Sequence, residues 1–387
     1  MSLMLRPRIG RLCRFASMAL GLALPGCESR PTATTAPARP APPTPAPATS
    51  VAPSQPAPGE PLPSAAPPVA TATPPNRAIS EATARRVLFG TSVPVEASRC
   101  AGATREKISC WLGVRYASDP QAKELVQELY TSFGTVVGQG EARTMDGAYR
   151  GTIRLVPTLP TGQDRKHLVW LHAALMKIDA FQKALSRELA PAADRAGLAY
   201  QASPLVVEFV RSLDGKRTPS GYASDWTYSY NVQGSLNVSA ESVLSLAFHE
   251  IFHLNDLDAG SGDGSGGARA WSARALSADV HAILARCKVT TAQAASRSTA
   301  CLAPYAPTAL QVRGGTYYAF QPGNDIVLEY AAELATRVFD EQRALLGLGP
   351  RVAGRPFKCG PPENARTWKA MIDGFFGGMD RVPACRS

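Results

Sequence analysis

Two of the five histidines in the chain belong to one short pattern, His249-Glu250-x-x-His253. An α-helix turns by about 100° per residue, so the two imidazoles point within about 40° of each other and can reach one metal ion. Glu250 projects about 60° from His253, beside that ion, where its carboxylate can take a proton from water. Because zinc lowers the pKa of a bound water to about 7, the pattern predicts Zn²⁺ held by His249 and His253, with Glu250 as general base. A pair of histidines held by local hydrogen bonds is the alternative.

A catalytic zinc site needs a third protein ligand, and the sequence offers several candidates. Glu329 and Glu333 are four residues apart, so they share one face of a predicted helix. One of them can bind the metal while the other holds a ligand histidine through its free N–H; a solvated helix face is the alternative. His281 is a further candidate, but it lies in an apparent amphipathic helix. Asp256 and Asp258 would have to fold back past the end of their own helix.

The two motifs together resemble the gluzincin branch of the zincin metallopeptidases over residues 226–341, and the second is similar to a helix of anthrax lethal factor-like enzymes. The resemblance implies a zincin-like metallopeptidase domain. It also implies that Glu329 is the third zinc ligand and that Glu333 orients a ligand histidine. Peptide hydrolysis needs a donor for the developing oxyanion, for which gluzincins commonly use a tyrosine or histidine. Tyr317 or Tyr318 can fill this role, and packing of either ring in a strand is the alternative.

The elements that must position these residues follow from the spacing of apolar side chains. Helices are predicted over residues 119–130, 167–189, 240–256, 270–287 and 325–346, and strands over 152–156, 205–210 and 226–238. The glycine-rich stretch 256–267 is predicted to be a flexible loop. This mixed order indicates an α+β fold with a mixed sheet, an active-site helix and a mostly helical C-terminal lobe, the lobes being about 78–255 and 256–387. The family resemblance adds that an extended substrate can pair with the strand at 228–238.

The N-terminal region has the composition of an export signal. Residues 1–27 carry arginines at positions 6, 8, 11 and 14, followed by a short apolar run that is too short to span a bilayer. The run ends in Leu-Pro-Gly-Cys, which resembles a bacterial lipobox and implies a lipid anchor at Cys27. An ordinary secretory signal peptide is the alternative. No other stretch of the chain is apolar for long enough to predict a transmembrane helix.

A proline-rich segment follows the signal. Between positions 31 and 76 lie 16 of the 33 prolines of the chain and no aromatic residue. Such a segment cannot bury enough apolar area to offset its chain entropy. Residues 28–77 are therefore predicted to be a disordered stalk that joins the membrane anchor to the domain at 78–387. A proline-rich ligand for a partner domain is the alternative.

Cysteine usage and charge restrict the compartment and the partners. Six cysteines remain after Cys13 and Cys27, an even number that suits disulfides in an exported chain. Short loops close at low entropic cost, so sequence neighbours are predicted to pair: Cys100 with Cys110, Cys287 with Cys301, and Cys359 with Cys385. The formal net charge is +10, but four arginines lie in the signal and no Lys/Arg block follows it, which argues against nucleic acid as a partner.

These observations predict an enzyme of the bacterial cell envelope that hydrolyses peptide bonds in a peptide or protein substrate by means of a zinc-activated water. We expect it to be anchored by lipid to the outer membrane or cell surface, or otherwise secreted. Two alternatives remain open. One is a non-enzymatic envelope lipoprotein whose metal site is structural or serves docking. The other is an enzyme that cleaves an amide bond of a cell-wall peptide.

Overall fold

The structure is a computed structural model that describes residues 77–146, 151–189, 198–213, 215–261, 270–290, 292–312, 315–321 and 323–386. The predicted signal at 1–27, the lipidation site Cys27 and all of the predicted stalk except Arg77 lie outside these residues. None of the described helices is both long and apolar enough to cross a membrane.

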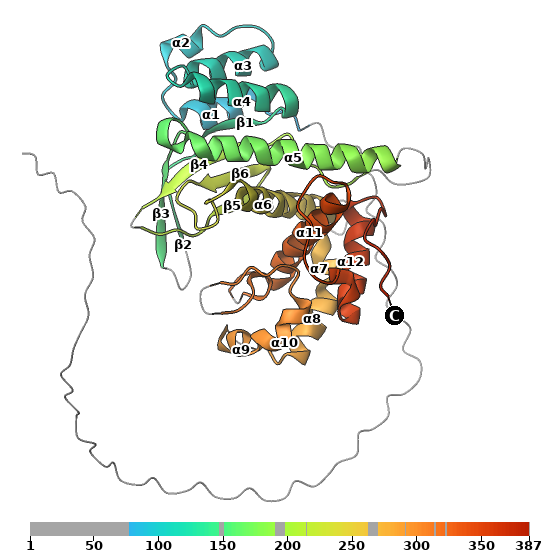
Figure 1. Cartoon of the computed structure of the whole chain (residues 1–387). Helices are drawn as coiled ribbons and strands as arrows, with labels where there is room; N and C mark the ends of the chain where they lie inside the picture. The colour runs from blue at the N-terminus through green and yellow to red at the C-terminus, as the bar shows by residue number, and fades with distance from the viewer. Residues whose placement is uncertain are drawn as a thin grey trace, which may run out of the picture. The chain divides into compact units, whose positions relative to one another are not determined.

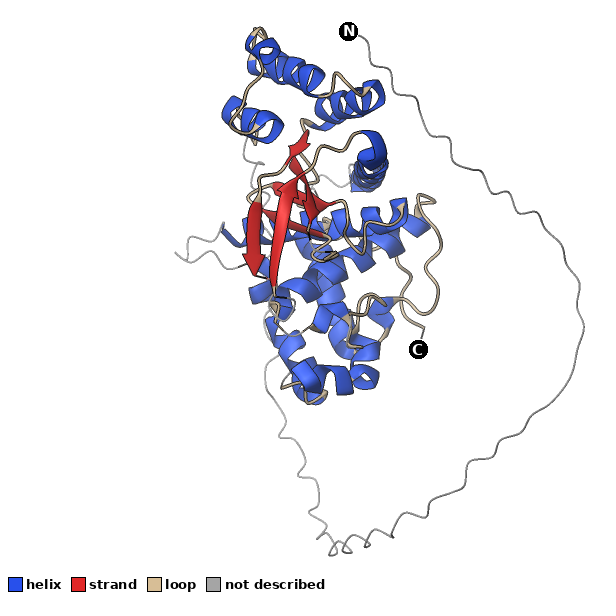
Figure 2. Cartoon of the chain, turned by 90° about the vertical axis from the view of Figure 1, so that its left-hand side faces the viewer, coloured by secondary structure: helices blue, strands red, loops and turns tan. Residues whose placement is uncertain are grey.

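A mixed β-sheet lies at the centre of the fold (Figures 1 and 2). Its described strands are β1 (Val136–Gln139), β2 (Arg143–Asp146), β3 (Thr152–Pro157), β4 (Val206–Ser212), β5 (Gly221–Ser224) and β6 (Thr227–Asn231). The order is β2-β3-β4-β6-β5, and β1 also pairs with β4. Strand β4 runs parallel to β1 and β6 and antiparallel to β3. The hairpin partner of β6, strand β5, is therefore an edge strand of the described sheet.

Helices from the N-terminal part of the described chain pack against this sheet, and the C-terminal helices pack on one of them and on one another. The N-terminal group is α1 (Glu81–Phe89), α2 (Val95–Ser98), α3 (Thr104–Arg115) and α4 (Pro120–Phe133), and the long helix α5 (Arg165–Leu189) follows. Helix α6 (Ala240–Ser261) packs against α5 and β5. The C-terminal group is α7 (Trp271–Ala275), α8 (Ser277–Arg286), α9 (Ala292–Arg297), α10 (Thr299–Leu302), α11 (Ile326–Leu345) and α12 (Pro362–Phe375). The observed class is α+β, as predicted.

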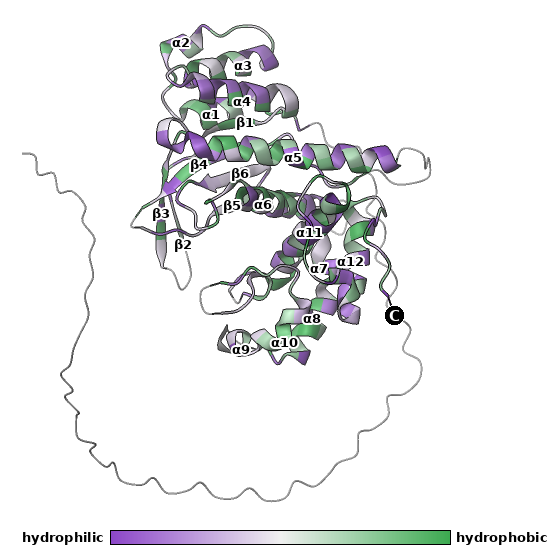
Figure 3. Ribbon diagram, viewed as in Figure 1, coloured by the Kyte–Doolittle hydropathy of each residue, from purple (hydrophilic) through white to green (hydrophobic). Residues whose placement is uncertain are grey.

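Helix α6 is largely apolar, and other parts of the protein cover it on most sides. Figure 3 shows hydrophobic colouring along much of its length, and its side chains from Val243 to Phe252 include several with no exposed surface. Phe248 stacks on Tyr200 on one side and on Phe339 of α11 on the other, with ring centroids 4.5 Å and 4.2 Å away. Aromatic burial of this kind fixes α6 against α11.

Most predicted elements are confirmed within a few residues. The helices at 119–130, 167–189, 240–256 and 325–346 and the strands at 152–156 and 205–210 correspond to α4, α5, α6, α11, β3 and β4. The predicted strand 226–238 is wrong beyond Asn231, because the chain turns there. A side chain at Gly234 would come within 2.6 Å of the Ser220 backbone, and Asn237 donates to the carbonyls of Ser220 and Asn231.

The predicted helix 270–287 is two helices, α7 and α8, with a break at Leu276, whose φ of −119° departs from the usual helical value of about −63°. The predicted loop 256–267 begins with the last two turns of α6, which ends at Ser261. The predicted boundary between lobes at 255 therefore falls inside a helix. Buried residues from Ala84 to Val382 belong to one hydrophobic cluster, so the two lobes share a core.

All three predicted disulfides are confirmed. The bonds join Cys100 to Cys110, Cys287 to Cys301 and Cys359 to Cys385. Each closes a short loop in the described chain, and together they indicate a protein of an oxidising, extracellular or secreted compartment.

Candidate metal centre

Two helix starts set the register of the site. At the start of α6, Ser239 Oγ accepts a hydrogen bond from the backbone N–H of Ser242 at 3.2 Å. At the start of α11, the Asp325 side chain accepts from the N–H groups of Val327 and Leu328. Glu241 in the first turn of α6 pairs with Arg343 of α11 at 3.1 Å. These caps and this ion pair align the two helices so that their motifs face each other.

Three side chains from the two motifs converge on one point. The Nε2 atoms of His249 and His253 are 3.1 Å apart. Oε2 of Glu329 lies 3.3 Å from Nε2 of His249 and 3.8 Å from Nε2 of His253. That oxygen is buried, and no donor among the described residues gives it a well-formed hydrogen bond. A buried carboxylate oxygen without a hydrogen bond and two imidazole nitrogens that face it make a donor set that can hold a metal ion.

Glu333 lies behind this cluster, where it was predicted to orient a histidine. Its Oε1 is 3.0 Å from Nδ1 of His249, and its Oε2 accepts a hydrogen bond from Thr308 Oγ1. Burial by itself lowers the pKa of His249, but the close contacts and charges of Glu329 and Glu333 outweigh it and hold that pKa well above its usual range. Contact at Nδ1 leaves Nε2 directed at the cluster.

The same charges act on Glu329 in the opposite direction. Burial raises the pKa of its carboxyl, but the close imidazole nitrogens of His249 and His253 and their charges dominate and hold the pKa well below its usual range. Asn324 Nδ2 donates to the other oxygen, Oε1, at 3.1 Å. Glu329 is therefore an ionised carboxylate with one oxygen held and one oxygen facing the histidines.

Glu250 follows His249 on α6 and is 6% exposed. Burial raises the pKa of its carboxyl, and the nearby histidines oppose that shift. Its carboxyl lies close enough to His249, His253 and Glu329 for their charges to act on it. A buried carboxylate beside such a cluster is suited to accept a proton.

The structure separates the two candidate tyrosines. The ring of Tyr318 meets that of His249 edge to face, with centroids 5.7 Å apart. Burial, followed by the charges of Glu329 and Glu250, raises the pKa of Tyr318 well above its usual range, so its hydroxyl stays protonated. Tyr317 instead forms a backbone bridge with Gln311 and packs against the core. The alternative, packing of the ring in a strand, is wrong for Tyr318, which begins a 3₁₀ turn, Tyr318–Phe320.

The remaining candidate ligands are engaged elsewhere. Asp256 accepts hydrogen bonds from the N–H and hydroxyl of Ser272, at 2.7 and 2.6 Å. Asp258 pairs with Arg77 at 2.6 Å. His281 is exposed and makes a hydrogen bond with the Ser277 side chain at 3.2 Å. The third member of the cluster is thus Glu329.

The predicted substrate strand is wrong. Strand β6 has a partner on each side, β4 in parallel and β5 antiparallel, so its backbone is not open to another chain. Strand β5, which packs against α6, has a partner on one side only in the described sheet. Sequence order could not reveal this, because β5 precedes β6 and folds back outside it.

Two residues that contact the carboxylates were not predicted. Thr308 and Asn324 lie in the segment between α10 and α11, outside both motifs. A lone threonine in a loop carries no sequence signal. Asn324 directly precedes the helix cap Asp325, and its position is the one available hint.

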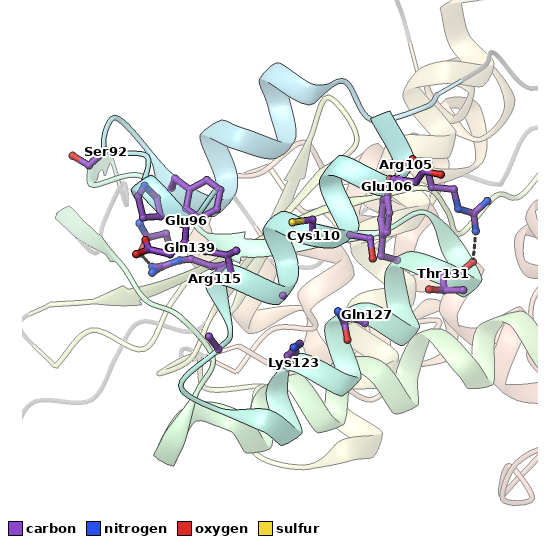
Figure 4. A pocket seen from close by; sticks show the side chains of 17 residues that line it. Ser92, Glu96, Arg105, Glu106, Cys110, Arg115, Lys123, Gln127, Thr131 and Gln139 are labelled. Atoms are coloured by element: carbon purple, nitrogen blue, oxygen red, sulfur yellow. Dashed lines mark hydrogen bonds between the residues drawn. The ribbon is translucent and has the colours of Figure 1, made fainter. Parts of the chain in front are cut away.

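A separate groove of about 1360 Å³ lies along α3 and α4 (Figure 4). Two of its arginines are engaged: Arg105 donates to the Thr131 carbonyl and Arg115 to the Gln139 side chain. No residue that lines it comes from α6 or α11. The groove is therefore distinct from the metal-binding cluster.

Comparisons of the chain with protein-family models, curated proteins and solved structures gave no match.

Proposed function

We propose that this chain is a zinc-dependent metallopeptidase with a zincin-like domain, exported and tethered to the cell envelope. The observation that carries the proposal is the convergence of His249, His253 and Glu329, with the buried carboxyl of Glu250 beside them. Three protein donors and a neighbouring carboxylate are the parts that metal-assisted hydrolysis requires.

The donor spacing fits zinc. Ligand atoms about 2.0–2.2 Å from zinc in tetrahedral geometry lie about 3.3–3.6 Å from one another. The observed separations are 3.1, 3.3 and 3.8 Å. Nitrogen and carboxylate donors in the ratio two to one also suit zinc. When bound, zinc would acidify water and polarise the substrate carbonyl.

Three residues of the chain would then transfer the proton, stabilise the oxyanion and orient a metal ligand. Glu250 takes the proton of the attacking water and returns it to the departing amine. Tyr318 donates its hydroxyl hydrogen bond to the developing oxyanion. Glu333 keeps Nε2 of His249 directed at the metal. The open edge of β5 can take up an extended peptide by strand addition.

The cellular setting is part of the proposal. The three disulfides favour an exported protein. The signal-like residues 1–27, the lipobox-like Cys27 and the proline-rich residues 28–76 support a lipid anchor and a stalk. A peptidase on a semi-rigid stalk would act on peptides near a membrane surface.

Two substitutions test the function. Glu250→Gln should keep stoichiometric zinc, measured by elemental analysis, yet lower peptide hydrolysis by about 10²–10⁴-fold because the proton acceptor is lost. Glu329→Ala should lose zinc affinity, because one of three ligands is removed. Glu128→Gln on the exposed face of α4 is the control and should change neither quantity.

Hydrolysis is assayed on a mixed peptide library, and cell-wall peptides are assayed in parallel. Wild-type protein that takes up no zinc after reconstitution, or a Glu250→Gln variant with normal turnover, contradicts the proposal. Zinc uptake without cleavage of any substrate would favour the non-enzymatic lipoprotein. Cleavage of cell-wall peptides alone would favour the amidase.

A further inference from the structure

Two polar side chains outside both motifs touch the two carboxylates of the site. Thr308 Oγ1 donates to Oε2 of Glu333, and Asn324 Nδ2 donates to Oε1 of Glu329 at 3.1 Å. We propose that Thr308 and Asn324 are positioning residues that direct the carboxylates and thereby set the affinity of the site for zinc. This inference rests on the proposed function.

The case for Asn324 begins with the two oxygens of Glu329. A carboxylate that is free to rotate offers either oxygen, or both, to a metal. Here Asn324 holds Oε1, and Oε2 alone faces the two Nε2 atoms at 3.3 and 3.8 Å. Glu329 lies in the first turn of α11, so the short link to Asn324 fixes the carboxylate against the start of its own helix. Losing this donor would free the carboxylate to turn away from the histidines.

Thr308 holds one oxygen of the Glu333 carboxylate by a hydrogen bond. The N–H of Leu310 donates to Thr308 Oγ1 at 3.4 Å, which occupies a lone pair and leaves the hydroxyl proton for Glu333. Glu333 Oε2 accepts the hydrogen bond of that hydroxyl, and its Oε1 lies 3.0 Å from Nδ1 of His249. A hydroxyl has one proton to donate, so the hydrogen bond of Thr308 runs to Glu333. With Oε2 held in this way, Oε1 stays directed at the ring whose Nε2 faces the metal position.

The two donors, Thr308 and Asn324, come from the same segment of the chain. Both donors lie between α10 and α11, whereas the residues they hold lie on α11. Partners that orient metal ligands typically change metal affinity by 10–100-fold when removed. Thr308 and Asn324 each act one contact away from a ligand or its partner, so we expect effects near the lower end of that range.

The test compares isosteric substitutions in the purified full chain. Thr308→Val removes the hydroxyl and keeps the shape, whereas Thr308→Ser keeps the hydroxyl. We expect the zinc dissociation constant, measured by competition with a chromophoric chelator, to rise about tenfold in Thr308→Val and to stay near wild type in Thr308→Ser. Thr336→Val is the matched control, because the Thr336 hydroxyl bonds only the Ala332 carbonyl of α11, at 2.9 Å.

The second arm concerns Asn324. Asn324→Ala should also weaken zinc binding about tenfold, and the visible absorption bands of bound Co²⁺ should shift because the Glu329 carboxylate can turn. Gln311 carries an exposed amide in the same segment, so Gln311→Ala is the control. It should change neither the zinc affinity nor the Co²⁺ absorption bands. Thermal unfolding of the metal-free proteins separates a folding defect from a loss of positioning.

The outcomes distinguish this inference from the proposed function. Unchanged zinc affinity in both Thr308→Val and Asn324→Ala, with normal affinity in wild type, overturns the inference and leaves the peptidase proposal intact. Equal losses in Thr308→Val and Thr308→Ser would overturn the role of the hydroxyl. Wild-type protein that binds neither zinc nor Co²⁺ overturns both proposals.

Discussion

At the scale of single residues, Tyr318 and Tyr317 offer a matched pair. Tyr318 lies beside His249, and Tyr317 packs against the core. We expect Tyr318→Phe to lower kcat by about 10²–10³-fold, because an oxyanion donor is lost, with little change in KM. Tyr317→Phe should retain wild-type kcat, since its hydroxyl contacts nothing in the cluster. Steady-state kinetics on one cleavable peptide measures both.

An equal loss of kcat in the two variants would remove Tyr318 from the oxyanion role. Zinc content should be measured in parallel, because Tyr318 also lies near Glu329. A variant that retains zinc and loses kcat supports donation to the oxyanion. A variant that loses zinc shows instead that the ring supports the ligands.

The site residues that the sequence could predict are those that share one face of a helix through their spacing along the chain. His249 and His253 share a face of one helix, and Glu329 and Glu333 share a face of another, because each pair is four residues apart. The choice between Tyr317 and Tyr318 depends on a 3₁₀ turn that has no such period. Thr308 could not be found at all, because its contact with Glu333 joins positions 25 residues apart.

At the scale of elements, the same division applies to strands. The strand at 205–210 and the helix that carries the first motif were predictable from runs of apolar residues. The strand order was not, because pairing joins distant segments and is set by packing of the whole sheet. The error at β6 follows from this: a strand that precedes the active-site helix in sequence is interior in space, and its hairpin partner β5 forms the edge.

The disulfide between Cys287 and Cys301 belongs to the element that supports the site. It anchors α10, from which Thr299 Oγ1 donates to the carbonyl of Gly315 at 2.7 Å. That contact holds the turn that leads into Tyr317 and Tyr318. We therefore expect the double substitution of Cys287 and Cys301 by serine to weaken zinc binding and kcat, in addition to lowering the free energy of unfolding by about 3 kcal/mol.

The disulfide between Cys100 and Cys110 provides the control. It lies beside the groove along α3, on elements that contribute no residue to the cluster. The two disulfides close loops of similar length, because their cysteines are 10 residues apart in this case and 14 residues apart for Cys287 and Cys301. Removal of the Cys100–Cys110 disulfide should cost comparable stability and leave zinc affinity unchanged. Urea unfolding and chelator competition measure the two effects separately. Equal losses of zinc affinity in both double variants would indicate a global effect.

At the scale of the whole molecule, the folded unit extends further than the composition indicated. Arg77, assigned by composition to the stalk, stacks over the Trp226 ring at 3.4 Å and pairs with Asp258 near the end of α6. The two predicted lobes share one core. Composition cannot predict such contacts. A single arginine next to a proline-rich segment has no compositional feature that separates it from that segment, and only its contacts with Trp226 and Asp258 place it in the folded domain.

The stability of this shared core should depend on pH through His167, a buried histidine on α5. Its Nδ1 lies 3.0 Å from the hydroxyl of Tyr230 on β6, so it joins α5 to the sheet. Burial, followed by the charge of Lys166, lowers its pKa from 6.5 to about 4. Asp164 opposes this shift and Arg211 adds to it. The folded chain therefore keeps His167 neutral where the unfolded chain would protonate it.

The sign of the effect follows from proton binding. Between pH 6.5 and about 4, the unfolded state binds more protons at His167 than the folded state does, so the free energy of unfolding falls as pH falls through this window. His167→Asn retains a polar partner for Tyr230 but cannot be protonated. We expect the loss of stability between about pH 7 and about pH 4.5, measured by urea unfolding of the zinc-free protein, to be smaller in this variant than in wild type. His281→Asn, at an exposed position on α8, should show the wild-type loss, because carboxylates that titrate in the same range are unchanged in it. An identical loss in His167→Asn and wild type would mean that protonation of this buried ring does not oppose folding.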